Sequence, residues 1–191
     1  GRFVLISATL FAAIGGFFVW TFVEYAMHNF NGHKMKGKTS FSREHLKHHA
    51  EEGYFASFPS KVLRACLIIP PVYFATALLM PSWVAFSFTA SFLGGHVLYE
   101  VVHYRLHFVP PTNAYMRWAA RHHFAHHFNC PKNNHGVTTS LWDHVFGTYQ
   151  QVQEVRVPRR LAMSWLVDEN TKEVHLPFQA TFRLTGKLRA S

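Results

Sequence analysis

The sequence predicts an all-α integral membrane protein with a polar, histidine-rich cap at one end of its membrane helices. Three observations lead to this prediction. Residues 3–23 carry no charged side chain. Residues 65–80 and 83–98 form two further apolar runs, which a short break separates. Fifteen histidines occur in 191 residues, and twelve of them lie between His28 and His127.

Composition supports a membrane protein and argues against binding to nucleic acid. Hydrophobic residues make up 49% of the chain and charged residues 15%, whereas about 25% charged is usual in soluble domains. The net charge is +9 with histidine neutral, but the basic residues are scattered and form no compact patch. This charge fits basic loops facing anionic headgroups on the cytoplasmic side. The two cysteines, Cys66 and Cys130, form neither a disulfide framework nor a zinc-finger spacing.

Residues 3–23 are expected to form the first membrane helix. About 20 apolar residues cross a bilayer core as a helix, and this stretch is too long for the core of a signal peptide. It leads directly into His28, so its end brings the first histidines to the membrane interface. In the polar segment that follows, Thr39-Ser40 or Ser42 is suited to cap a short helix over residues 44–49.

Residues 65–80 and 83–98 are expected to form a membrane hairpin. Trp83 would mark the far interface. The second helix is expected to continue to Phe108, which makes it about 39 Å long at 1.5 Å per residue. Because the bilayer core is about 30 Å thick, the last two turns of this helix would stand in the cap. Another helix is expected over residues 113–128.

These elements predict about three membrane helices, with both histidine-rich segments on one side. Residue 1 would then lie on the opposite face, as expected if one earlier helix precedes this chain. The alternative, a soluble helical core, would require residues 3–23 to be buried on all sides of a small domain. We expect a membrane domain with its cap over residues 1–149. Residues 150–191 form a C-terminal tail with no assigned role, although alternating valines there hint at a strand.

Ten of the histidines fall into four groups with the spacing of metal ligands. A neutral imidazole is the commonest metal ligand in proteins. Residues three or four apart share one helix face, so each group can present two or three imidazoles in one direction. A five-residue spacing suits a helix end that unwinds into a loop. Ten ligands predict two ions with four or five nitrogens each. The groups are His28 and His33; His45, His48 and His49; His103 and His107; and His123, His126 and His127.

Other residues are candidates for holding these ligands in place. A metal-bound histidine usually donates its second N–H to a carboxylate or a carbonyl. Glu100, beside Tyr99, is the first choice for that carboxylate, and Asp143 is another candidate. His96 lies two helical turns before His103 and shares its face, with ordinary packing as the alternative role. Weaker candidates are His122, His135 and His144.

The order of these motifs resembles the fatty acid hydroxylase superfamily, and most of all its fatty acid 2-hydroxylase branch. That branch shows His-x4-His, His-x2-His-His, His-x3-His and His-x2-His-His in this order, which match the four groups above. The pair Tyr99-Glu100 resembles a Tyr-Asp pair of the branch. The resemblance covers residues 16–149. His96 and Phe108 depart from it, because an aromatic residue and a further histidine are more usual at these positions.

The resemblance implies a nonhaem di-iron monooxygenase that hydroxylates a lipid acyl chain with dioxygen, using the ten histidines as catalytic metal ligands. Zinc could replace iron in a purified sample, because affinity alone does not select iron. Electrons would come from an external carrier, such as a b-type cytochrome or a ferredoxin. The same centre could serve a sterol or lipid desaturase or a carotenoid hydroxylase, and a non-catalytic membrane zinc protein is a more distant alternative. The metal site would lie on the cytoplasmic side of the endoplasmic reticulum or of a bacterial inner membrane.

Overall fold

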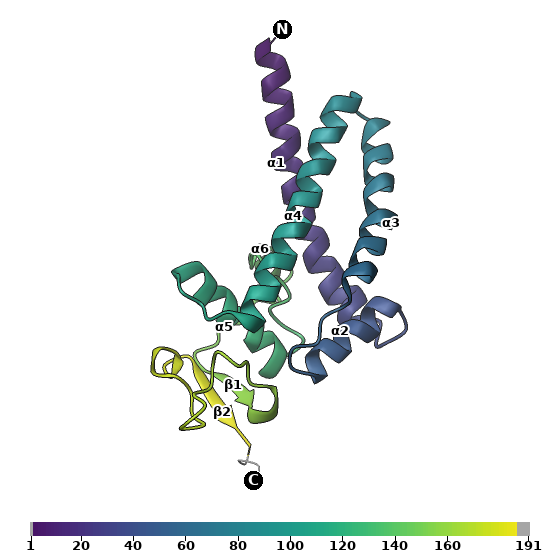
Figure 1. Cartoon of the computed structure of the whole chain (residues 1–191). Coiled ribbons are helices and arrows are strands. Elements are labelled where there is room, and N and C mark those ends of the chain that lie inside the picture. Colours follow the sequence, from purple (N-terminus) through teal and green to yellow (C-terminus); the bar gives the residue numbers. More distant parts are fainter. Residues whose placement is uncertain (1, 187–191) are drawn as a thin grey trace. The chain divides into compact units, whose positions relative to one another are not determined.

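The computed structural model describes residues 2–186 and is mostly helical (Figure 1). The chain divides into two compact units. The first unit comprises the residues up to 24 together with residues 56–100. The second comprises residues 25–55 together with the residues from 101 onward. Each unit is therefore assembled from two separate stretches of the chain.

The first unit consists of long apolar helices. α3 (Phe58–Ala77) lies within it, whereas α1 (Arg2–Ala26) and α4 (Ser82–Phe108) each run from it into the second unit. A short turn joins α3 to α4, which confirms the expected helical hairpin. α3 begins before the expected apolar run, because Ser57 caps it by accepting a hydrogen bond from the Ser60 amide.

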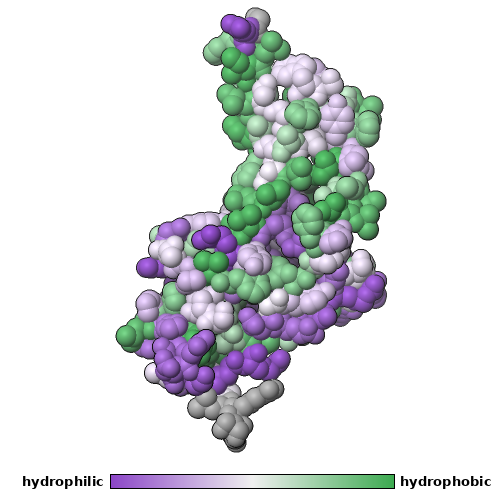
Figure 2. All heavy atoms as spheres, in the orientation of Figure 1, coloured by the Kyte–Doolittle hydropathy of each residue, from purple (hydrophilic) through white to green (hydrophobic). Residues whose placement is uncertain are grey.

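Much of the apolar surface of the first unit faces outward. α3 has no buried residue, and Phe3 and Phe11 of α1 are 83% and 74% exposed. Figure 2 shows hydrophobic residues over much of α1 and over the part of α4 farther from its turn to α3. Within the described residues, one helical stretch, Arg2–Lys34, is long and apolar enough to cross a membrane. Large exposed apolar surfaces of this kind mark contact with lipid or with another protein.

The second unit contains the shorter helices that carry most of the histidines. They are η1 (Met27–Lys34), a π-helix, and the α-helices α2 (Ser40–Ala50), α5 (Ala114–Phe128) and α6 (Leu141–Val145). Thr39 caps α2 by accepting a 3.0 Å hydrogen bond from the Ser42 amide, as the sequence predicted. Asn113 caps α5 in the same way, through the Met116 amide. These caps fix where α2 and α5 begin.

The described part of the C-terminal segment folds against α5. Two short strands, β1 (Val155–Pro158) and β2 (Phe182–Thr185), pair in parallel with Val155 opposite Phe182. Single-turn 3₁₀-helices, η2 (Arg159–Leu161) and η3 (Leu176–Phe178), lie between them in the sequence. The first strand confirms the alternating-valine signal, so the fold is mostly helical rather than purely so. The proposed domain boundary at residue 149 stays a prediction.

Candidate metal centre

The π-helix η1 explains the spacing of the first two histidines. Its hydrogen bonds join residues five apart, so His28 and His33 lie about one turn from each other. In an α-helix the same two residues would point about 140° apart. The sequence led us to expect an unwound loop here, and the structure instead keeps a wider helix. π-helical segments are rare and frequently occur at functional sites.

The ten predicted histidines lie in the second unit and come together in two groups of five. Within each group the ligand nitrogens lie within 4.8 Å of one another. Cluster one comprises His28, His33, His45, His49 and His126. Cluster two comprises His48, His103, His107, His123 and His127. The sequence predicted two sites with four or five nitrogens each, and the structure divides the same ten residues accordingly.

Each His-x-x-His-His motif serves both clusters. On α2, His45 and His49 are four residues apart and face cluster one, whereas His48 faces cluster two. The motif on α5 is the mirror of this arrangement, because His123 and His127 face cluster two and His126 faces cluster one. Two imidazoles of each motif therefore point in one direction, as the spacing predicted, and the third faces the other cluster. Each motif links the two clusters rigidly through one helix.

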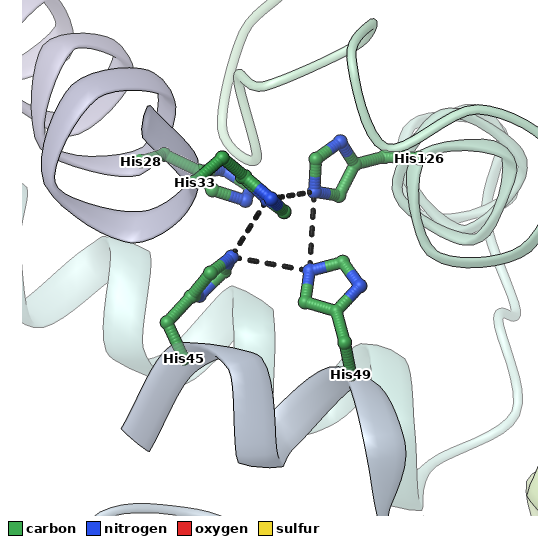
Figure 3. A group of neighbouring side chains, drawn as sticks. All are labelled: His28, His33, His45, His49 and His126. Atoms are coloured by element: carbon green, nitrogen blue, oxygen red, sulfur yellow. Dashed lines mark hydrogen bonds between the residues drawn. The ribbon is translucent and has the colours of Figure 1, made fainter. Parts of the chain in front are cut away.

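The side chains of cluster one converge from three elements (Figure 3). Four of their Nε2 atoms form a closed ring in which each nitrogen lies near the next. Metal-bound nitrogens about 2.1 Å from an ion lie about 3.0 Å apart when they occupy neighbouring positions at right angles. The ring has this size. Its sides are His33–His126 at 2.9 Å, His126–His49 at 3.2 Å, His49–His45 at 3.1 Å and His45–His33 at 2.9 Å.

Backbone carbonyls hold the outer nitrogens of three of these imidazoles. In cluster one, Nδ1 of His28 donates to the His135 carbonyl, and Nδ1 of His126 donates to the Asn133 carbonyl at 2.7 Å. In cluster two, Nδ1 of His48 donates to the Tyr54 carbonyl at 2.7 Å. A neutral imidazole that donates through Nδ1 keeps a lone pair on Nε2. These bonds therefore aim an unprotonated nitrogen into each cluster, as metal-bound histidines require.

The donor set fits a metal ion in each cluster. Nε2 of His28 and Nε2 of His127 are buried and have no hydrogen-bond partner within the described structure. Burial, followed by repulsion from the neighbouring imidazoles, holds the pKa of His45, His49 and His127 well below the usual 6.5. Neutral imidazole is the form that binds metal. Lone pairs facing one another at 3 Å repel unless a cation lies between them.

Aromatic rings pack against the imidazoles of cluster two. The ring of Phe55 lies 4.9 Å from that of His48 and 5.0 Å from that of His103. Phe124 lies 5.1 Å from His107. All five imidazoles of this cluster are buried, whereas three of the five in cluster one are only partly buried. Cluster two thus has a drier environment.

Close packing brings α2 up to η1. Ser42 donates a 2.8 Å hydrogen bond to the Gly32 carbonyl. A Cβ atom at Gly32 would lie 2.9 Å from the His45 ring, which is closer than real contacts allow. Gly32 is therefore needed for His45 to reach the cluster.

The residues expected to hold the ligands occupy different places. His96, in the first unit, packs against Trp20 with ring centres 4.8 Å apart, and its ring stacks on Tyr99. Glu100 forms a 2.5 Å ion pair with Lys61. The roles predicted for these three residues stay predictions. Asp143 is completely buried in the second unit and binds the His135 amide. His135 carries a carbonyl that contacts cluster one, a role that spacing could not reveal because the backbone supplies it.

The structure combines a helix long and apolar enough to cross a membrane with two clusters of five histidines each, which is the arrangement of a helical protein with two metal sites. The chain belongs to the fatty acid hydroxylase family, whose model matches residues 13–148. It is similar to fatty acid 2-hydroxylases within that family. The resemblance read from the four histidine motifs is thereby confirmed.

Several relatives show the extent of this similarity. A dihydroceramide fatty acyl 2-hydroxylase of Arabidopsis thaliana is 35% identical over 76% of this chain, and the match spans 62% of that protein. The human fatty acid 2-hydroxylase is 34% identical over 70% of the chain, spanning 38% of its own length. The hydroxylase domain visible in the solved structure of scs7p matches with a TM-score of 0.63 at 30% identity, covering 76% of this chain and 57% of that one. The chain thus spans only part of these relatives.

Proposed function

We propose that the chain is a membrane-bound nonhaem di-iron monooxygenase that hydroxylates the 2-position of a fatty acyl chain, free or in a sphingolipid. The observation that carries this proposal is the division of ten histidines into two groups of five. Relatives named as fatty acid and dihydroceramide 2-hydroxylases support the substrate class. The same names favour hydroxylation over desaturation.

Each cluster would hold one iron ion through its Nε2 atoms. When bound, the pair of ions would supply the activation of dioxygen that attack on an unactivated C–H bond requires. The balanced reaction places one oxygen atom in the alcohol and releases the other as water. It therefore consumes two electrons and two protons. An external one-electron carrier, such as a b-type cytochrome or a ferredoxin, would deliver the electrons.

The protein's own contribution is to prepare the ligands and to exclude water. The carbonyls of Asn133, His135 and Tyr54 fix three imidazoles in the tautomer that leaves Nε2 free. Burial keeps the imidazoles neutral. The rings of Phe55 and Phe124 cover cluster two with apolar surface. A dry site of this kind protects reactive species from solvent.

We also propose that α1, α3 and α4 are membrane helices and that the clusters face the cytoplasm. The outward apolar side chains of α1 and α3 support lipid contact. Lys34 ends η1, and Lys36 and Lys38 lie between η1 and α2; all three are exposed. Lysine-rich loops favour the cytoplasmic side.

The test is lipid profiling of cells that express the chain. We expect mass spectrometry to find 2-hydroxylated acyl chains that are absent from control cells and that carry ¹⁸O from ¹⁸O₂. His126→Ala should abolish this product, because it removes a nitrogen of the ring in cluster one. His175→Ala is the matched control, since His175 lies outside both clusters. Equal product from His126→Ala and the unchanged chain would contradict the proposal.

A further inference from the structure

Asp143 joins three segments of the second unit through a completely buried carboxylate. Its Oδ1 accepts hydrogen bonds from the His135 amide at 2.8 Å and from the Thr148 hydroxyl at 2.7 Å. Its Oδ2 accepts from the Gly136 amide at 2.8 Å and contacts Nε2 of His122 at 3.3 Å. Both carboxylate oxygens are thus fully used.

The segment that Asp143 holds is the one that contacts cluster one. Asn133 and His135 supply the carbonyls that accept Nδ1–H of His126 and His28, respectively. Two hydrogen bonds therefore separate the Asp143 carboxylate from a cluster-one imidazole. In cluster two, the carbonyl that accepts the hydrogen bond from His48 belongs to Tyr54, in a loop that Asp143 does not contact.

The backbone around this carboxylate leaves no room for adjustment. A Cβ atom at Gly136 would collide with the Thr139 carbonyl oxygen and lie 3.0 Å from Oδ2 of Asp143. The main-chain carbonyl of Asp143 also accepts hydrogen bonds from the Thr148 and Tyr149 amides, at 2.8 Å and 3.0 Å. Asp143 therefore fixes the loop at His135 and Gly136. Asn134 adds hydrogen bonds to the Thr148 carbonyl and to the backbone of Gln150.

The carboxylate is ionised in this setting. Burial alone would raise the pKa of Asp143, but hydrogen bonds from His122, Thr148 and the two amides outweigh it and lower the pKa below its usual value. An ionised carboxylate accepts through both oxygens. The isosteric amide of asparagine has a single acceptor oxygen and two donor hydrogens, so it would turn a donor toward one of the amides.

We propose that Asp143 is a positioning residue for cluster one alone. It holds the loop carbonyls that orient His28 and His126, and its loss would misplace these two ligands while the helix-borne ligands of cluster two keep their geometry. The inference rests on the metal sites of the proposed function but requires no catalytic turnover. Loss of outer hydrogen-bonding partners typically weakens metal binding by about 10–100-fold.

The experiment measures Zn²⁺ affinity in variants that retain one cluster at a time. Because Zn²⁺ needs only four ligands, two histidines are removed to disable a cluster. His123→Ala with His127→Ala disables cluster two and reports on cluster one, and His28→Ala with His126→Ala does the reverse. We expect Asp143→Asn to weaken Zn²⁺ binding about 10–100-fold where cluster one alone is retained. Where cluster two alone is retained we expect a change of less than about threefold. Equal losses in both backgrounds, or no loss in the first, would overturn the proposal.

Two further variants separate positioning from folding. Asp168→Asn is the matched control, because Asp168 also accepts backbone amide bonds, from Asn170 and Thr171, but in an exposed turn. It should change neither affinity. Thr148→Val removes one of the bonds to Asp143 and retains the carboxylate, so it decides the question if Asp143→Asn does not fold. It should weaken cluster one by a few-fold and leave cluster two unchanged; no selective loss would overturn the proposal. Absence of lipid product with these affinities intact would refute only the proposed reaction.

Discussion

Clusters one and two contain the same number of histidines but are built and protected differently. Cluster one takes ligands from a π-helix, and two of its imidazoles depend on carbonyls of one loop. Cluster two takes all five ligands from α-helices, and all five are buried. Matching ligand sets can therefore differ in access and in the origin of their rigidity. Cluster one is more exposed and two of its imidazoles rest on one loop, whereas cluster two is fully buried and its ligands all come from α-helices.

Acid should destabilise the metal-free protein through both clusters alike, which is the largest effect we expect. Burial lowers the pKa of His126 in cluster one and of His127 in cluster two. Above pH 6.5 both the folded and the unfolded forms are neutral at these histidines. Below it, only the unfolded form takes up protons, so stability falls. Each such histidine costs about 1.4 kcal/mol at one pH unit below 6.5.

Thermal unfolding of the metal-free protein in detergent at pH 7.5 and 5.5 measures this effect. His126→Gln and His127→Gln should each reduce the pH-dependent loss by a similar amount, because each removes one titrating group. A stability that does not change between these pH values would show that the imidazoles are not held neutral. If only one of the two variants reduced the pH-dependent loss of stability, the two clusters would not contribute alike.

Removal of metal should distinguish the clusters by access. His33, His45 and His49 are only partly buried, whereas a chelator reaches cluster two only after local opening. We expect two phases of Zn²⁺ release to a chromophoric chelator, with rates about tenfold or more apart, since each 1.4 kcal/mol of opening free energy contributes a factor of ten. His28→Ala with His126→Ala should remove the fast phase, and His123→Ala with His127→Ala should remove the slow one, because each pair leaves fewer than the four ligands that Zn²⁺ needs. A single phase, or the opposite assignment, would contradict the comparison.

Spacing along the chain was enough to select the ten histidines that gather in the two clusters. An offset of four residues placed His45 beside His49 and His123 beside His127, because α-helical periodicity brings such pairs onto one face. The hairpin of α3 and α4 and the cap of α2 followed from apolar runs and from Thr39. These features depend on helical periodicity, on the length of apolar runs and on capping residues, all of which are visible in a short stretch of sequence.

Spacing could not show how each motif divides between the clusters. Whether His48 joins His45 or His103 depends on how α2 packs against α4 and α5, and this is a tertiary arrangement. The π-helical form of η1 was also beyond local prediction, since π-helices have no strong sequence signal. Backbone carbonyls as partners of Nδ1 were missed in favour of Glu100, because only side chains are visible in a sequence.

The C-terminal segment should contribute the smallest effect, through a single hydrogen bond to the end of α4. The indole N–H of Trp165 donates a 3.0 Å bond to the Leu106 carbonyl. In a continuing helix that carbonyl would accept from residue 110, but Pro110 has no N–H. Trp165 therefore satisfies a buried carbonyl one residue before His107, a ligand of cluster two. Trp165→Phe should lower the free energy of unfolding by about 1–2 kcal/mol.

Denaturant titration of Trp165→Phe in detergent checks this value. Trp83→Phe, at the exposed start of α4, is the control. Its free energy of unfolding should lie within about 0.5 kcal/mol of that of the unchanged protein. If the bond also steadies His107, the slow phase of Zn²⁺ release should quicken slightly while the fast phase stays the same. The carbonyl of Leu106 belongs to the helical turn that carries His107, so Trp165 should affect cluster two and the slow phase. A change in the fast phase alone would mean that Trp165 acts on cluster one. In that case the C-terminal segment would not stabilise cluster two, and the end of α4 would be stable without it.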